Sequence, residues 1–117
     1  MNGVLILAHG SRAKQTEQTF EAVVEMAKNK VDVPVEIAYM EFSEKNIESG
    51  FNALLAQGIN HIKVVPYFLF SGMHIKQDIP EEIAAFLEKH PNIHIEMGET
   101  LGADPRLADI LADRILG

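Results

Sequence analysis

Four short apolar runs alternate along this chain with longer segments that have the periodicity of amphipathic helices. The runs cover residues 4–8, 35–40, part of 61–70, and 93–97. Strands that alternate with helices pair in parallel, because each helix carries the chain back to the end of the sheet where the previous strand began. The pattern therefore predicts an α/β fold with a four-stranded, mostly parallel sheet.

The apolar pattern within each run predicts its place in the sheet. The first and third runs are almost continuously apolar, as expected for strands that helices cover on both faces. The second and fourth alternate between apolar and polar residues, which is typical of edge strands. With right-handed crossovers, this predicts the order 2-1-3-4 and a three-layer sandwich with helices on both faces.

Capping residues mark the expected helix ends. Ser11 is a candidate cap for the first helix, Asp78 precedes Pro80 in a sequence that resembles a capping box, and Asp104 precedes Pro105. Gly58 stands where the second helix needs a left-handed residue after its end. The inward stripe of the first helix is predicted to contain Thr16, Phe20, Val23, Val24 and Ala27.

Length and composition limit the protein classes. A chain of 117 residues with 47% hydrophobic residues has the size of one domain, so residues 1–117 are expected to form a single core. The longest apolar run, residues 64–70, is too short to cross a bilayer, and no secretory signal stands at the N-terminus. We expect a cytoplasmic protein without a membrane partner.

Charge and the absence of cysteine restrict the possible ligands. The net charge of −7 and the lack of a basic cluster argue against nucleic acid as a partner. Because the chain contains no cysteine, any metal ion must be held by histidine, carboxylate or water.

Titratable residues follow each of the four predicted strands. His9, Glu41, His74 and Glu99 come shortly after the first, second, third and fourth strands. Ligands of open parallel sheets bind beyond the carboxyl ends of the strands, so these side chains are predicted to gather at one edge. Any one of them alone is more often an ordinary loop residue than a functional one, but two imidazoles and a carboxylate together can bind a divalent ion or accept protons.

Neighbouring segments suggest how a ligand would be held. Gly10, Ser11 and Arg12 form a short strand-to-helix junction that could bind an anion. Residues 68–70 and Met73 are expected to be partly core, although some could floor a pocket for a flat apolar ligand.

The remaining histidines are predicted to lie elsewhere. His61 begins the third strand and should lie at the opposite edge of the sheet. Pro91 places His90 and His94 on different elements, and His94 alternates with isoleucines, so it should face solvent or a partner subunit.

Two longer motifs carry a family resemblance. LILAHGSR at 5–12 and VPYFLFSGMHIKQDIP at 65–80 resemble the short CbiX or SirB-like group of class II chelatases, with further similarity at 38–41 and 101–107. The resemblance implies insertion of Co²⁺ or Fe²⁺, with Ni²⁺ as a further candidate, into sirohydrochlorin on the route to cobalamin or sirohaem. The metal is then a substrate, no prosthetic group is implied, and short members are thought to pair as homodimers.

The resemblance also assigns roles to residues. His9 and His74 match the two metal-binding and proton-accepting histidines, and Glu41 matches a glutamate after the second strand. The family commonly has a proline shortly after this glutamate, whereas residues 43–46 contain none. The predicted substrate-binding residues are Gly10, Ser11, Arg12, Phe70, Ser71, Gly72, Met73 and Lys76.

Two other functions use the same residues. A metal or tetrapyrrole carrier would bind its ligand stoichiometrically without turnover, which an absorbance assay of multiple turnovers would reveal. Phosphoryl chemistry at His9 is the second alternative, but histidine phosphatases place an arginine directly before the histidine, where this chain has Ala8.

Overall fold

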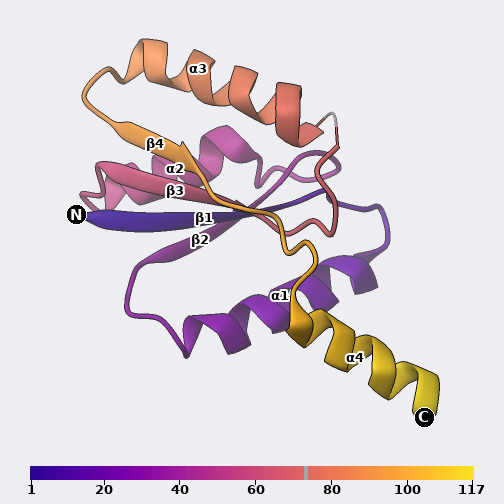
Figure 1. Cartoon of the computed structure of the whole chain (residues 1–117). Helices are drawn as coiled ribbons and strands as arrows, with labels where there is room; N and C mark the ends of the chain where they lie inside the picture. The colour runs from indigo at the N-terminus through magenta and orange to yellow at the C-terminus, as the bar shows by residue number, and fades with distance from the viewer. Residues whose placement is uncertain (73) are drawn as a thin grey trace.

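The computed structural model describes residues 1–72 and 74–117, and the side chains of His74 and Ile75 are outside the described part. The predictions for Met73 and for the side chain of His74 therefore lie outside the described residues. Strands and helices alternate along the chain (Figure 1), in the order β1 (Asn2–Ala8), α1 (Lys14–Lys28), β2 (Val35–Tyr39), α2 (Ile47–Ala56), β3 (His61–Pro66), the π-helix η1 (His74–Asp78), α3 (Ile79–Lys89), β4 (His94–Met97) and α4 (Pro105–Leu116).

The four strands form one parallel sheet in the order β2-β1-β3-β4, which confirms the predicted order. In the register, Leu7 of β1 lies opposite Pro66 of β3, while His61 at the start of β3 lies opposite His94. All four carboxyl ends consequently meet at one rim of the sheet.

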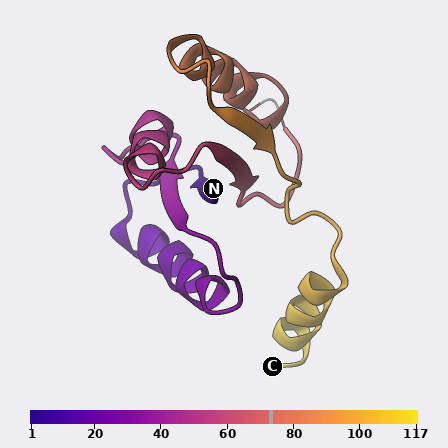
Figure 2. The same cartoon turned by 90° about the vertical axis from the view of Figure 1, so that its left-hand side faces the viewer.

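Helices lie on both faces of the sheet (Figure 2), with α2 and α3 on one side and α1 on the other. The larger core forms beneath α2 and α3, where Phe51 and Phe86 pack on buried residues of the central strands, including Leu5 and Val64. A smaller cluster beneath α1 contains Ala8, Phe20, Val24 and Tyr39. These two apolar layers anchor the strands whose ends form the candidate site.

The prediction that both faces of β3 are covered is wrong. Burial alternates along β3, and Lys63 is exposed. The cause is the position of α1, which packs on β1 and β2 and leaves the same face of β3 and β4 open. The buried stripe of α1 is also narrower than the sequence predicts, because α1 packs on only two strands. Phe20 and Val24 are buried, whereas Thr16, Val23 and Ala27 are exposed.

The helix ends agree only in part with the sequence. Gly58 has a φ of +84° after α2, and the Asp104 side chain accepts the Arg106 N–H at 2.8 Å, as predicted. The Ser11 prediction is wrong, because Ala13 is the N-cap and Ser11 Oγ instead accepts the N–H of that residue. Asp78 makes no side-chain cap, because η1 continues directly into α3 with helical backbone.

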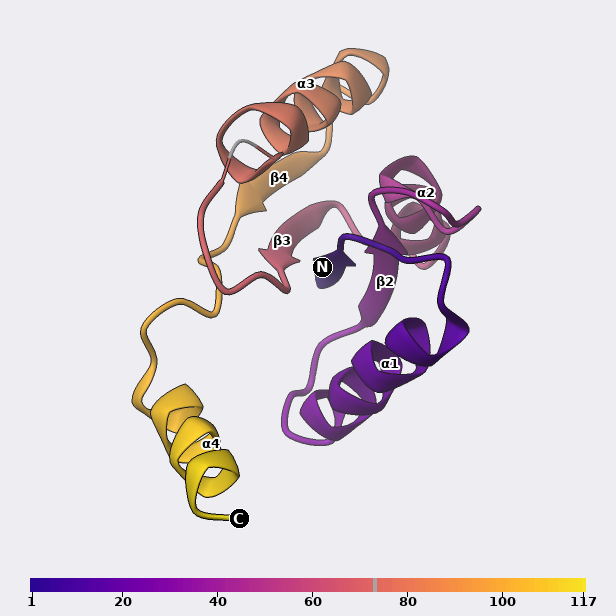
Figure 3. The ribbon, with the colours of Figure 1, turned by 90° about the vertical axis from the view of Figure 1, so that its right-hand side faces the viewer.

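The C-terminal helix α4 stands clear of the sheet in the views of Figures 2 and 3. Leu107 is half-buried, and every other residue of α4 is exposed. Its apolar side therefore has no cover within the described part of the chain. None of the helices described in the structure is long and apolar enough to cross a membrane.

Candidate functional site

His9 lies at the carboxyl-end rim, directly after β1. Its exposed ring stacks on Phe68, with the ring centroids 4.3 Å apart and the planes 5° from parallel. The two residues meet because Leu7 and Pro66 are paired in the register of β1 and β3. Phe68 is only 8% exposed, so the sheet holds the surface on which the imidazole rests.

The end of β2 brings Glu41 to the same place. The Met40 N–H donates to Ala8 O at 2.9 Å, and the Glu41 N–H donates to His9 O at 3.0 Å, so the parallel ladder continues past the assigned strands. The Glu41 side chain itself is exposed. The structure therefore places the backbones of His9 and Glu41 side by side at the rim.

Gly10 makes this close approach possible. Its φ of +92° lies in the left-handed region, and a Cβ atom there would collide with the carbonyl oxygen of Glu41. Only glycine fits a position that combines a positive φ with a neighbouring backbone at this distance.

A cavity of about 410 Å³ opens beside His9, between the rim and α1. Its walls are mainly apolar, and Phe20 forms edge-to-face contacts with Tyr39 and Tyr67, at centroid distances of 5.5 and 5.1 Å. The full lining is Ala8, His9, Gly10, Thr16, Glu17, Thr19, Phe20, Tyr39 and Tyr67. Its size and its mainly apolar lining with a few polar groups are typical of pockets that bind small organic ligands.

Two aromatic residues of this cavity, Tyr39 and Tyr67, were not among the site residues predicted from the sequence. Tyr39 is the last residue of β2, and Tyr67 directly follows β3. The signal that could have identified them is their position close to candidate residues, two residues before Glu41 and one residue before Phe68. The Tyr39 hydroxyl donates to Glu21 Oε2 at 2.7 Å. Burial, followed by the nearby Glu21 carboxylate, raises the pKa of Tyr39, so this phenol stays protonated at neutral pH.

The anion-binding candidates lie on the same rim. Arg12 is exposed, and its guanidinium carbon lies 4.9 Å from the centroid of the Phe42 ring. Phe42 directly follows Glu41 and has a left-handed φ of +61°. Ser11 Oγ accepts the Ala13 N–H at 3.1 Å, and its own proton can still be donated to an anion.

Beyond Phe68, the residues after β3 line other surfaces than the cavity. Phe70 is 80% exposed and lines a groove against α4, while Ser71 and Glu99 line a separate depression of about 450 Å³. In η1, the Lys76 N–H donates to Gly72 O at 3.1 Å. The structure therefore does not bring Phe70 and Ser71 into the His9 cavity, and whether the His74 ring joins His9 lies outside the described residues.

The other histidines lie away from this rim, as the sequence predicts. His61 and His94 stand at the starts of β3 and β4, level with Asn2, at the opposite end of the sheet. His90 stacks on Phe86 at 4.1 Å, and one of its ring nitrogens contacts Phe86 O at 3.1 Å.

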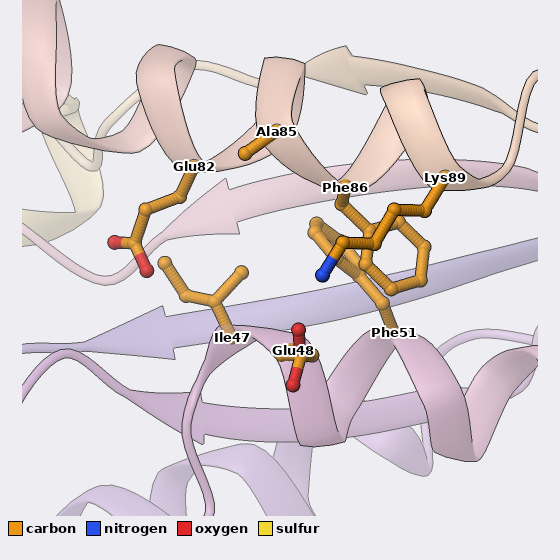
Figure 4. A pocket seen from close by; sticks show the side chains of 7 residues that line it. All are labelled: Ile47, Glu48, Phe51, Glu82, Ala85, Phe86 and Lys89. Carbon is orange, nitrogen blue, oxygen red and sulfur yellow. The ribbon is translucent and has the colours of Figure 1, made fainter.

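A second depression lies between α2 and α3 (Figure 4), lined by residues that include Phe51, Phe86 and Glu82. Its volume of about 130 Å³ holds only a few water molecules. Burial, with a smaller effect from Asp78, raises the pKa of Glu82. This depression lies on the face of the sheet that α2 and α3 cover, shares no lining residue with the His9 cavity beneath α1, and does not contribute to the candidate site.

Comparison with known proteins gives consistent matches. The family model described as CbiX matches residues 3–116. The sirohydrochlorin ferrochelatase of Priestia megaterium is 40% identical over 98% of this chain and 44% of its own length. The sirohydrochlorin cobaltochelatase of Methanothermobacter thermautotrophicus is 34% identical over 97% of this chain and 90% of its own length.

A solved structure extends the match to three dimensions. The sirohydrochlorin chelatase SirB from Bacillus subtilis subspecies spizizenii, in complex with cobalt, superimposes with a TM-score of 0.92 at 38% identity. The match covers 97% of this chain and 49% of that one. This chain thus spans about half the length of the ferrochelatase and SirB chains that it matches, and most of the length of the cobaltochelatase.

Proposed function

Because this chain belongs to the CbiX family, we propose that it inserts Co²⁺ or Fe²⁺ into sirohydrochlorin, as one chelatase lobe formed by residues 1–117. The relatives named for this activity act with iron or with cobalt. The observation that supports the proposal best is the exposed His9 imidazole, which is stacked on Phe68 beside an apolar cavity at the carboxyl-end rim.

Metal insertion needs a base and a ligand in the same place. Two pyrrole N–H protons must leave the macrocycle as the divalent ion enters, so that the charge of the ring nitrogens balances that of the metal. A neutral imidazole can accept a proton or bind a borderline divalent ion at neutral pH. We assign both tasks to His9 and, on sequence grounds, to His74, with Glu41 as a helper.

An incomplete ligand set is useful for this reaction. A closed site of four ligands would retain the ion, whereas two imidazoles and a carboxylate leave positions open to the pyrrole nitrogens. Stacking on Phe68 holds the His9 ring in one orientation, which lowers the entropy lost when the ion binds. Because the planes of the His9 and Phe68 rings are nearly parallel, the imidazole nitrogens lie along the edge of the stack and do not point at the Phe68 ring.

The carboxylates of the substrate need local cations, since the whole chain carries a charge of −7. Arg12 is exposed on the same rim as His9, and Lys76 is exposed on η1. We propose that these two cations and the Ser11 hydroxyl bind substrate carboxylates, while Tyr39 and Tyr67 line the apolar surface beside the ring.

We also propose that two copies of this chain form the working enzyme. The longer relatives contain about twice the length of this chain. A groove of about 680 Å³ lies between Leu69, Phe70 and the apolar side of α4, where Ile110 and Leu111 are exposed. A second copy is the occupant that this groove suits, because the same interface would supply the second lobe that a macrocycle needs.

Multiple turnover with sirohydrochlorin and Co²⁺, followed by absorbance, tests the activity. We expect wild-type turnover and a loss of at least about 100-fold for His9→Ala, with the fold retained by circular dichroism. His90→Ala is the matched control, because His90 lies between the end of α3 and the start of β4, at the opposite end of the sheet from the rim. Stoichiometric capture without turnover would replace the enzyme by a carrier, and near-normal turnover by His9→Ala would refute the assignment of His9.

Light scattering tests the dimer. The wild type should have the mass of two chains, and Ile110→Asp combined with Leu111→Asp should have the mass of one, because carboxylates cannot be buried in an apolar interface. Glu88→Asp on α3 is the control for an exposed substitution away from the groove. A monomeric wild type, or a double variant that remains dimeric, contradicts this proposal.

A further inference from the structure

Two histidines and a glutamate meet at the end of the sheet opposite the candidate site. His61 begins β3, and His94 and Glu96 stand two residues apart on β4. The parallel register pairs His61 with His94, and their ring centroids are 4.3 Å apart. Residues two apart on a strand point to the same face, so all three side chains lie on the face that α1 leaves open.

The ligand atoms of this group are close together. One nitrogen from each histidine and one carboxylate oxygen all lie within 4.8 Å of one another, and His61 Nε2 is 3.8 Å from Glu96 Oε1. Ligands around a tetrahedral ion, at bond lengths of about 2.1 Å, are separated by about 3.4 Å. The side chains are at least partly exposed, so small rotations about their χ angles can close this difference.

We propose that His61, His94 and Glu96 form a second divalent-cation site, which binds borderline ions such as Zn²⁺, Co²⁺ or Ni²⁺. Imidazole and carboxylate ligands in a two-to-one ratio select these ions over Mg²⁺ and Ca²⁺, which prefer oxygen alone. Water would complete the coordination, because the site is open to solvent.

This site is separate from the insertion site. His61 lies opposite Asn2, the first residue of β1, in the strand register. His9 follows Asn2 by seven residues along the direction of β1, which corresponds to about 23 Å at the usual rise of a strand. An ion held by His61 cannot reach a macrocycle at the His9 rim. Its effect is on the fold, because it links the edge strand β4, which has four residues, to the central strand β3. The stability of that edge then depends on the supply of metal.

One neighbouring cation weakens the site without blocking it. Lys63 lies opposite Glu96 in the register and on the same face. Its side chain extends toward Gly98, because a Cβ atom added to that glycine would lie 3.5 Å from Lys63 Cδ. Gly98 follows β4, so the lysine stem runs away from His61. Lys63→Gln should therefore tighten metal binding by about two- to fivefold.

The test begins from a variant that lacks the two proposed insertion ligands, His9→Ala with His74→Ala, so that its result does not depend on the proposed function. Calorimetric titration with Zn²⁺ and the visible spectrum of Co²⁺ should show one ion per chain. Adding His61→Ala, His94→Ala and Glu96→Gln should weaken binding by at least about a hundredfold. The control pair His90→Gln and Glu88→Gln removes the same residue types elsewhere and should leave binding unchanged.

Thermal unfolding gives a second, independent readout. With Zn²⁺ at ten times its dissociation constant, the melting temperature of the background variant should rise by about 5 °C, and this rise should disappear with the three substitutions. Circular dichroism checks that each variant folds. The proposal is overturned if the background variant binds no metal, or if it binds metal equally well without His61, His94 and Glu96.

Discussion

Gly10→Ala is expected to lower stability more than any other glycine-to-alanine change outside the core of the sheet. The methyl group would enter a left-handed backbone position and collide with the Glu41 carbonyl oxygen. The first effect costs about 1–2 kcal/mol, and the second about 1–3 kcal/mol as the strand ends move apart. The free energy of unfolding should therefore fall by about 2–5 kcal/mol.

Two other glycines separate these effects. Gly58 has a φ of +84° with no atom within 4 Å of a Cβ, so Gly58→Ala should show the backbone cost alone, about 1–2 kcal/mol. Gly72 has open space and no positive φ, so Gly72→Ala should change stability by less than about 0.5 kcal/mol. Gly72→Ala thus has neither the backbone cost nor the collision, Gly58→Ala has the backbone cost alone, and Gly10→Ala has both.

Urea unfolding, followed by circular dichroism, measures all three differences on the same protein. The order Gly72→Ala, Gly58→Ala, Gly10→Ala should be one of increasing destabilisation, with similar m-values. If Gly10→Ala costs no more than Gly58→Ala, the close contact between Gly10 and Glu41 has no energetic weight. The account of how the rim holds His9 beside Glu41 would then be refuted.

Three further changes test other parts of the molecule. Tyr39→Phe should lower the free energy of unfolding by about 1 kcal/mol in urea unfolding, because it removes the hydrogen bond to Glu21; an unchanged midpoint would show that this bond adds nothing. Phe51→Ala should cost about 3–5 kcal/mol in the same assay, since its fully buried ring packs on Phe86, and a loss below 1 kcal/mol would mean that the α2–α3 core is loose. The raised pKa of Glu82 means that its ionised form is disfavoured in the fold, so its contribution to stability falls as pH rises through the usual glutamate range. Glu82→Gln should therefore raise the free energy of unfolding at pH 7 by no more than about 0.5 kcal/mol, because the side chain is only partly shielded from solvent, and should leave it unchanged at pH 3 in urea unfolding.

Local patterns in the sequence were sufficient for the strand order and for several helix ends. Strand 1 is central because its apolar run is continuous, and the structure places β1 between β2 and β3. Gly58 ends α2 with a left-handed φ, and Asp104 caps the first turn of α4. Both features depend on the residue type at a single position, so they can be predicted from the local sequence. The placement of His9 and Glu41 at strand ends also followed, because parallel strands carry their carboxyl ends to one rim.

Contacts between distant segments needed the tertiary structure. Phe68 could be recognised as apolar, but its stacking under His9 depends on the register between β1 and β3. Lys63 is exposed because α1 does not extend over β3. The apolar side of α4 is exposed because no other described part of the chain packs on it. The sequence alone therefore determined the order of the strands and helices and the end of the sheet at which His9 and Glu41 lie. The grouping of His61, His94 and Glu96 was decided only by the pairing of β3 with β4, because register arises from the packing of whole strands and leaves no local mark on a single residue.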